Sequence, residues 1–243
     1  MNVRLYGNGT EDLLPALAAV GCAVADAGVP DVVVAYGGDG ALLGAEREFP
    51  GIPKFPVRDC RVAKLCPEHA CYEGQFRRLA AGTLGHRSLM KLVGTAHGQA
   101  LVAINDVFIH HANPVTAIRY RVLIDDRAYG HEIVGDGVGV ATVHGSTAYY
   151  RSITHSIFRA GIGLAFSNST EVTNHLVLPE DTTIRVRLTR GPAVLVADND
   201  PRHIPLSEGD EAVIARNGEA ATVLGLEIFM CPACRKLRHA RQP

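Results

Sequence analysis

The 243-residue sequence has no surplus of positive charge, because 24 lysines and arginines face 25 acidic residues and leave a net charge of −1. A chain without an overall basic field has no general means of holding nucleic acid by counterion release. It also has no apolar run near the roughly 20 residues that span a bilayer, and residues 1–7 hold no apolar stretch for a signal peptide. We therefore expect a cytoplasmic protein without nucleic-acid or membrane partners.

Cysteine is scarce, with six residues in the whole chain, so a disulfide framework is excluded and a reducing compartment is the simpler assumption. Two pairs nevertheless have metal-ligand spacing. Cys231 and Cys234 are spaced as in a zinc knuckle, whereas Cys66 and Cys71 are spaced more loosely. If the pairs meet, they would form a closed tetrahedral Zn²⁺ site. The alternative is that they are reduced structural or surface thiols.

Apolar residues make up 47% of the sequence and charged residues 20%. This composition contains enough apolar residues to form a packed core and does not indicate disorder. At roughly 100–200 residues per domain, the length predicts one large domain or two small ones. The pattern changes near residue 87. Before it, a β-branched strand at residues 31–36 alternates with helical patterns at residues 12–20, 41–46 and 72–81.

The second half of the sequence predicts mainly strands separated by turns. The expected fold class is therefore an α/β N-terminal lobe followed by a mainly-β C-terminal lobe. We expect the α/β lobe to span residues 1–85, with residues 216–243 packing back on it. The mainly-β lobe is expected to span residues 86–215.

The strand at residues 31–36 ends in the turn Gly37, Gly38, Asp39 and Gly40, and a helical pattern follows. Glycines let a phosphate approach the backbone closely, and a helix N-terminus attracts an anion. A carboxylate beside phosphates is repelled by them, so Asp39 needs another purpose. Accepting the proton of an attacking hydroxyl is the obvious one. The alternative is that Asp39 only caps the helix.

Asn105 and Asp106 interrupt an otherwise apolar strand at residues 100–110. Left without partners, these polar groups would cost several kcal/mol. Neighbouring side chains on a strand point to opposite faces, so a shared ligand requires a bulge or a strand end at this point. The alternative is a polar pair whose hydrogen bonds are satisfied within a turn.

A third segment runs from Asp136 along a strand to a turn at Gly145. A helix is expected to start near Ser146 or Thr147 and to run through Phe158. Hydroxyl groups at a helix start suit a cap, and the helix N-terminus is again receptive to an anion. As a single feature this segment is weak, because such helix starts are common.

In this order, the three segments resemble the NAD kinase family. The family pattern has a Gly-Gly-Asp-Gly turn, an Asn-Glu or Asn-Asp pair in a later strand, and an Asp-Gly strand that leads into Thr-Pro-Thr-Gly-Ser-Thr-Ala-Tyr. Residues 194–200 also look like the family's later strand ending in Asp-Gly-Gln, so the resemblance extends from about residue 31 to residue 200.

The resemblance implies a two-domain NAD kinase-like fold and a phosphotransferase. This enzyme would pass a phosphoryl group from ATP or polyphosphate, with Mg²⁺, to the 2′-hydroxyl of NAD to give NADP, and would form a homo-oligomer. Asp39 would be the base, and Asn105 and Asp106 would hold the ribose and nicotinamide side of NAD. We expect Asp39 and Asp106 to face each other across a cleft.

The resemblance also places the remaining substrate contacts. Besides Gly37, Gly38 and Gly40 of the turn, the contacts to adenosine and nicotinamide groups fall on Asp136, Thr147, Ala148, Tyr149 and Ser152, with the ring of Tyr149 as a packing surface.

The sequence departs from the family pattern around the third segment. Thr142-Val143-His144-Gly145 stands in place of Thr-Pro-Thr-Gly, and Ser-Ile-Thr-His-Ser-Ile at residues 152–157 in place of Ser-Ala-Gly-Gly-Pro-Ile. Larger side chains thus replace small ones near the expected ligand. They leave open a different hydroxyl acceptor, such as a nucleoside or a lipid. A non-catalytic nucleotide-binding sensor is a third hypothesis, and the intact glycine turn argues against it.

Overall fold

The computed structural model describes residues 1–239 and divides them into two compact units. Unit 1 comprises residues 1–89 and 221–239, and unit 2 comprises residues 90–220. Both boundaries lie a few residues beyond those expected from the sequence. Residues 240–243 of the expected C-terminal segment lie outside the described residues.

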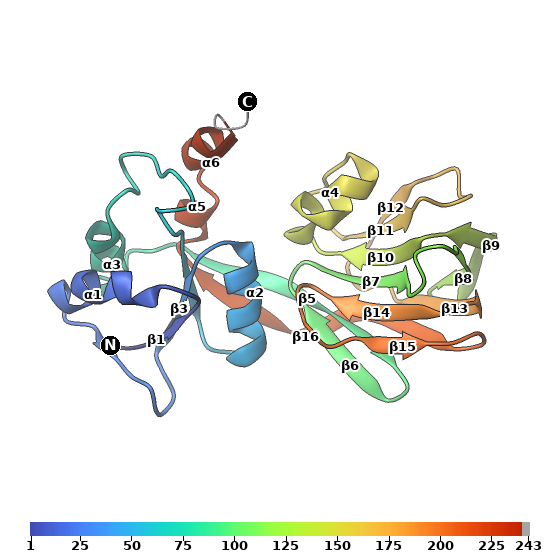
Figure 1. Cartoon of the computed structure of the whole chain (residues 1–243), viewed down its shortest axis with the longest axis horizontal. Coiled ribbons are helices and arrows are strands. Elements are labelled where there is room, and N and C mark those ends of the chain that lie inside the picture. Colours follow the sequence, from blue (N-terminus) through green and yellow to red (C-terminus); the bar gives the residue numbers. More distant parts are fainter. Residues whose placement is uncertain (240–243) are drawn as a thin grey trace. The chain divides into compact units, whose positions relative to one another are not determined.

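Unit 1 is an α/β unit (Figure 1). Its elements are β1 (Asn2–Tyr6), a 3-10 turn η1 (Thr10–Leu13), α1 (Leu14–Ala19), β2 (Ala23–Val24), β3 (Val32–Tyr36), α2 (Asp39–Glu48), β4 (Lys54–Val57), α3 (Tyr72–Ala80), α5 (Leu226–Phe229) and α6 (Pro232–His239). The strands pair in parallel in the order β2-β1-β3-β4. Two long strands, β5 (His86–Ala96) and β16 (Glu211–Leu224), connect the two units through the chain.

Helices cover both faces of the unit 1 sheet, as the continuous apolar run of β3 predicts for a doubly covered parallel strand. Val34 of β3 packs in one cluster with Leu17 of α1 and Phe76 of α3. The next residue, Ala35, packs with Ala45 of α2 on the other face. The alternation of β3 side chains thus fixes which helix lies on which face.

The apolar C-terminal segment also packs within unit 1. Val223 at the end of β16 pairs in parallel with Lys54 of β4. Val223 and Phe229 of α5 are buried together with Leu42 of α2, and Ile228 is buried in the cluster formed with α1 and α3. The last strand of the chain therefore completes the sheet of unit 1.

Unit 2 consists mainly of strands. Its elements are β6 (Gln99–Ala103), β7 (Asp106–His111), β8 (Ile118–Ile124), β9 (Arg127–Gly135), β10 (Gly137–Ala141), a 3-10 turn η2 (Gly145–Thr147), α4 (Tyr149–Thr154), β11 (Ile162–Ser167), β12 (His175–Leu178), β13 (Ile184–Arg190), β14 (Ala193–Ala197) and β15 (Ile204–Leu206). One sheet has the order β12-β11-β10-β7-β14-β15. Strands β16, β13, β8 and β9 pair antiparallel and belong to the same ten-stranded sheet as β1–β4; within unit 2 they bury the main core against the first sheet.

Helix α4 covers the outer face of the first sheet, where Tyr150 packs against Phe108 of β7. This helix ends at Thr154, so the expectation of a helix running through Phe158 is wrong. The expected single strand at residues 100–110 is also divided, since β6 ends at Ala103 and β7 begins at Asp106. The α/β unit and the β unit confirm the predicted fold class. Within residues 1–239, no helix combines the length and the hydrophobicity needed to cross a membrane.

Candidate functional site

The glycine turn lies where β3 ends. Gly37 follows the last strand residue, Tyr36, and has φ +137°, a conformation that L side chains rarely adopt. Helix α2 begins two residues later at Asp39. The parallel strands β1 and β4 end beside β3, with Tyr36 in register with Val57. In open parallel sheets this edge is the usual place for a ligand.

A cavity of about 940 Å³ opens at this edge of unit 1. It is lined by residues 5–8 after β1, residues 36–38 and 41 around the glycine turn, and residues 58–59 and 62–64 after β4. The volume suits a small-molecule ligand. The turn predicted to approach a phosphate therefore borders a cavity large enough for a nucleotide.

The carboxylate of Asp39 is 59% exposed and accepts a hydrogen bond from Arg58 Nη2 at 3.3 Å. Arg58 is itself only 12% exposed, because its guanidinium lies 3.7 Å from the ring centroid of Phe229. Gly38, not Asp39, occupies the N-cap position of α2. These contacts favour an oriented, solvent-accessible carboxylate over a capping role.

Arg58 was not identified from the sequence, although one signal was present. It directly follows β4, so its side chain starts at the same sheet edge as the glycine turn. Charged residues at the carboxyl ends of neighbouring parallel strands are brought together by the register of the sheet.

The Asn105–Asp106 pair lies at the junction between β6 and β7 in unit 2, held by a carboxylate from the end of β14. Asp198 accepts the backbone N–H groups of Ile104, Asn105 and Asp106 at 2.7, 2.8 and 3.1 Å. Asp198 is therefore a positioning residue that sequence reasoning did not assign. Its signal was the strand at residues 193–197 that ends in an acidic residue.

Asp106 lines a second cavity of about 440 Å³ together with Asp198, Phe108, His110 and Tyr149 among others. Burial, reinforced by the negative charge of Asp198, raises the pKa of Asp106 to about 7. Burial, together with the nearby His111, lowers the pKa of His110. A carboxyl group that changes charge near neutral pH is thus placed in a concave site, which is a common property of functional residues.

Asn105 is 9% exposed, and its side-chain oxygen has no hydrogen-bond partner among the described residues. A buried acceptor without a partner costs about 1–3 kcal/mol. The alternative of an internally satisfied turn pair therefore does not account for the side chain of Asn105. Asn105 itself lines none of the three cavities described in this section, although the adjacent Asp106 lines one of them.

The third segment packs directly on this pair. Thr142 donates its backbone N–H to Asn105 O at 2.8 Å and its hydroxyl to Ile104 O at 2.6 Å. A Cβ atom at Gly145 would lie 2.1 Å from Asn105 O, so only glycine allows this approach. The second and third sequence segments are therefore one structural assembly.

Tyr149 stands at the start of α4 with its ring against two aromatic side chains of β7. The ring centroids lie 4.9 Å from Phe108 and 5.5 Å from His110. Tyr149 is still 41% exposed and lines two cavities, the one that contains Asp106 and a further one of about 440 Å³ with Ser152 and His155. It thus offers a partly exposed aromatic surface.

The other predicted contacts are less closely grouped. Thr147 is exposed and donates its hydroxyl to His144 O at 3.3 Å, and Ala148 follows it, half-buried. Asp136 accepts a hydrogen bond from Asn168 Nδ2 at 2.9 Å and lines none of the three cavities described above. The glycine turn with Asp39 belongs to unit 1, whereas all of these residues belong to unit 2. That Asp39 and Asp106 face each other stays a prediction.

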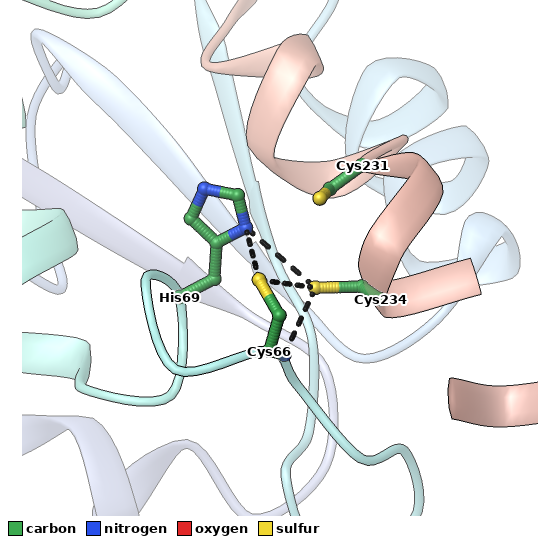
Figure 2. Close-up of side chains that lie close together, drawn as sticks. All are labelled: Cys66, His69, Cys231 and Cys234. Atoms are coloured by element: carbon green, nitrogen blue, oxygen red, sulfur yellow. Dashed lines mark hydrogen bonds between the residues drawn. The ribbon is translucent and has the colours of Figure 1, made fainter. Parts of the chain in front are cut away.

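The cysteine pairs are brought together in unit 1, but with a different fourth residue. Cys66, Cys231 and Cys234 group with His69, and all four potential ligand atoms lie within 4.8 Å of one another (Figure 2). Cys71 is exposed and lies outside the group. The expectation of Cys71 as a ligand is therefore corrected to His69, three residues after Cys66.

Known proteins similar to this chain are NAD kinases. The chain is 32% identical to the NAD kinase of Chloroflexus aggregans over 209 residues, which cover 81% of this chain and 75% of the relative. It is 32% identical to the NAD kinase of Acidithiobacillus ferrooxidans over 216 residues, covering 82% and 71%. The chain matches no protein-family model.

Two solved structures share the fold. An NAD kinase from Archaeoglobus fulgidus in complex with ATP superimposes with a TM-score of 0.78 at 18% identity, covering 97% of this chain and 99% of that one. Yeast NADH kinase complexed with NADH gives a TM-score of 0.76 at 19% identity, covering 92% and 83%.

Proposed function

Because the chain belongs to the NAD kinase family, we propose that Asp39 is the base that accepts the proton of the 2′-hydroxyl of NAD during phosphoryl transfer. The protein is an ATP-dependent kinase that converts NAD into NADP. The observation that carries the role of Asp39 is its exposed carboxylate, which Arg58 orients; Arg58 and the adjacent Gly38 line the cavity of unit 1, whereas Asp39 itself does not.

The reaction requires a bond to form between the 2′-oxygen of NAD and the γ-phosphorus of ATP while the bond from that phosphorus to the β–γ bridging oxygen breaks. ADP leaves, and the hydroxyl proton passes to Asp39. Proton acceptance by a positioned carboxylate contributes roughly 10²–10⁴ in rate. In a loose transition state most of the remaining rate enhancement comes from positioning and from electrostatic stabilisation.

Arg58 positions the carboxylate. Its guanidinium is fixed against the ring of Phe229, and its Nη2 reaches Asp39 Oδ1 at 3.3 Å. This contact restricts the carboxylate without burying it. The backbone of Gly37 and Gly38, which have no side chains, leaves room for phosphate oxygens beside the N-terminus of α2.

Asn105 and Asp106 bind the ribose of NAD in this proposal. The unpartnered oxygen of Asn105 accepts a hydrogen bond from a donor group of the ligand. Asp106, when ionised, accepts one from a ribose hydroxyl, and Asp198 holds both residues through their backbone N–H groups. Tyr149 provides the aromatic surface for a ring of the dinucleotide.

Magnesium fits this arrangement as an ion delivered with ATP. The glycine turn contains a single carboxylate, that of Asp39, and Mg²⁺ in such sites is held largely by phosphate oxygens and water, with one or two carboxylates. When bound, Mg²⁺ supplies positive charge that stabilises the transferred phosphoryl group. Asp39 is the residue of the turn that would meet its hydration shell.

We further propose a cytoplasmic location and a homo-oligomeric state. All six cysteines are free, which suits a reducing compartment. The oligomer follows from the family resemblance, and light scattering coupled to size-exclusion chromatography measures it: a monomeric mass would contradict it.

The test of the catalytic proposal is Asp39→Asn. This change removes the proton acceptor and keeps the side-chain volume, so we expect turnover to fall by at least about 10²-fold with NAD affinity largely retained. Product formation is followed by mass spectrometry with NAD, a nucleoside and a lipid as acceptors, and with ATP and polyphosphate as donors.

Asp26→Asn, at an exposed position of unit 1, is the matched control and should keep wild-type turnover. Arg58→Gln should lower turnover less than Asp39→Asn, since the acceptor remains. Near-wild-type kcat for Asp39→Asn would exclude Asp39 as the base.

A further inference from the structure

We propose that Cys66, His69, Cys231 and Cys234 bind one Zn²⁺ ion, which braces the loop that forms one wall of the cavity in unit 1. The three sulfur atoms and the imidazole point toward one another (Figure 2). Cys66 Sγ lies 3.3 Å from His69 Nδ1 and 3.4 Å from Cys234 Sγ, and Cys234 Sγ lies 3.6 Å from His69 Nδ1.

These separations lie within a few tenths of an ångström of those around a tetrahedral ion and are far longer than a disulfide bond, and Cys231 Sγ lies within 4.8 Å of the other ligand atoms. With Zn–S bonds of about 2.3 Å and a Zn–N bond of about 2.0–2.1 Å, tetrahedral geometry places the ligand atoms about 3.5–3.8 Å apart. A disulfide would need its sulfur atoms about 2.05 Å apart. Three cysteines and one histidine also form a standard closed structural zinc set.

The loop at residues 58–71 and the segment at residues 231–237 meet at this group, and they contain almost no other buried residues. Within residues 58–71, the loop between β4 and α3, the one buried residue is Cys66. Within residues 231–237, the buried residues are Cys231 and Cys234. The local cluster consists of these three cysteines with Leu65 packed against them. An apolar core of this size is too small to fix a long loop against a terminal helix, whereas a metal centre can do so.

The backbone around the group supports metal ligation. Cys66 donates its N–H to Cys234 Sγ at 3.3 Å, a bond that stabilises negative charge on a thiolate. The turn that carries His69 is tight, since the backbone N–H of His69 donates a hydrogen bond to Cys66 O at 2.9 Å. The buried side chain of Gln75 donates to His69 O at 2.7 Å and so anchors this turn to α3. Such outer contacts orient metal ligands.

Zinc is the metal that this donor set favours. Thiolates and imidazole in a tetrahedron select Zn²⁺ among common divalent ions. Binding displaces three thiol protons to solvent and leaves a centre with a net charge of −1, with His69 neutral.

The position of the centre explains its purpose. Arg58 and Asp59, together with residues 62–64, line the cavity beside the glycine turn, and Cys66 follows two residues later. A metal bond at Cys66 therefore fixes the end of this wall. The zinc proposal stands on its own geometry and does not depend on which ligand the cavity binds.

The first experiment measures metal in the wild-type chain, purified with a thiol reductant and without chelator. Elemental analysis should give about one zinc per chain. After removal of zinc, Co²⁺ should produce sulfur-to-cobalt charge-transfer bands and the strong visible bands of tetrahedral cobalt. Zinc far below one per chain together with no such bands would overturn the proposal, as would a metal-free chain with a Cys66–Cys234 disulfide in its mass spectrum.

Variants identify the ligands. Cys66→Ser and Cys234→Ser should lose most of the metal, whereas Cys71→Ser, an exposed cysteine five residues from Cys66, should keep all of it. His69→Ala should weaken metal binding, and His69→Cys should restore it. His69→Cys should also shift the cobalt bands, whereas replacing a histidine that is not a ligand would leave them unchanged. Equal metal loss in Cys71→Ser would overturn the ligand set.

The bracing role has its own readout in the wild-type chain. Limited proteolysis should cut within residues 58–71 several-fold faster after chelation than in the zinc-loaded protein. Equal cleavage rates would overturn this role even if zinc is bound.

Discussion

The raised pKa of Asp106 leads to a prediction about stability as well as about binding. Asp106 is buried and lies near the negative charge of Asp198. Both conditions make the ionised form of Asp106 unfavourable in the folded protein. Asp106→Asn keeps the shape of the side chain and removes the ionisation. We expect this variant to be more stable than the wild type at high pH and to bind NAD more weakly.

The magnitude follows from the pKa change. The pKa of Asp106 rises from the ordinary carboxyl value of 3.8 to about 7, and one pKa unit corresponds to about 1.4 kcal/mol. Between these two values the unfolded chain is ionised while folded Asp106 keeps its proton. The free energy of unfolding therefore contains the full contribution of protonated Asp106 below pH 3.8. This contribution decreases as the pH rises and is absent above about pH 7.

From about pH 5 to about pH 8 this loss amounts to about 3 kcal/mol in the wild type and is absent in Asp106→Asn. Urea unfolding of both proteins at several pH values measures it. Titrating groups that do not interact with residue 106 are shared by the two proteins and cancel in the difference. A free-energy difference between variant and wild type that stays constant from about pH 5 to about pH 8 would refute the reasoning.

Two further changes test the assembly around Asn105. Asn105→Ala removes the unpartnered acceptor and should weaken NAD binding by about 1–3 kcal/mol in calorimetry. It should not lower Tm, because the cost of burying that acceptor is removed as well; unchanged affinity with a lower Tm would mean a purely structural role. Gly145→Ala places a Cβ 2.1 Å from Asn105 O and should destabilise the fold by about 1–3 kcal/mol in urea unfolding. Its control is Gly74→Ala in α3, where the space is open and no loss is expected; equal stability of the two alanine variants would contradict the close approach.

Local signals predicted the elements that depend on local chemistry. The β-branched run at residues 32–36 forms a strand buried on both faces, and the glycines after it form the turn before α2. The segments around Asn105 and Gly145 were each recognised as polar or glycine-dependent points in apolar surroundings. The helix after Tyr149 was predicted too long, because helical periodicity does not show where tertiary packing ends a helix.

Residues that act through long-range contacts could not be predicted in this way. Arg58 reaches Asp39 only because β3 and β4 are parallel and in register. Asp198 becomes the acceptor for Asn105 and Asp106 only because β14 pairs with β7. Neither pairing is encoded by spacing along the chain.

The sequence by itself thus determined the two kinds of lobe, the glycine turn with Asp39, and the presence of cysteine pairs with metal-ligand spacing. Tertiary structure alone decided that His69, not Cys71, joins the other three cysteines, and that Asp106 is buried beside a second carboxylate. The reason is physical: secondary structure and turns follow from neighbouring residues, whereas ligand sets and pKa values depend on which side chains distant segments bring within a few ångströms.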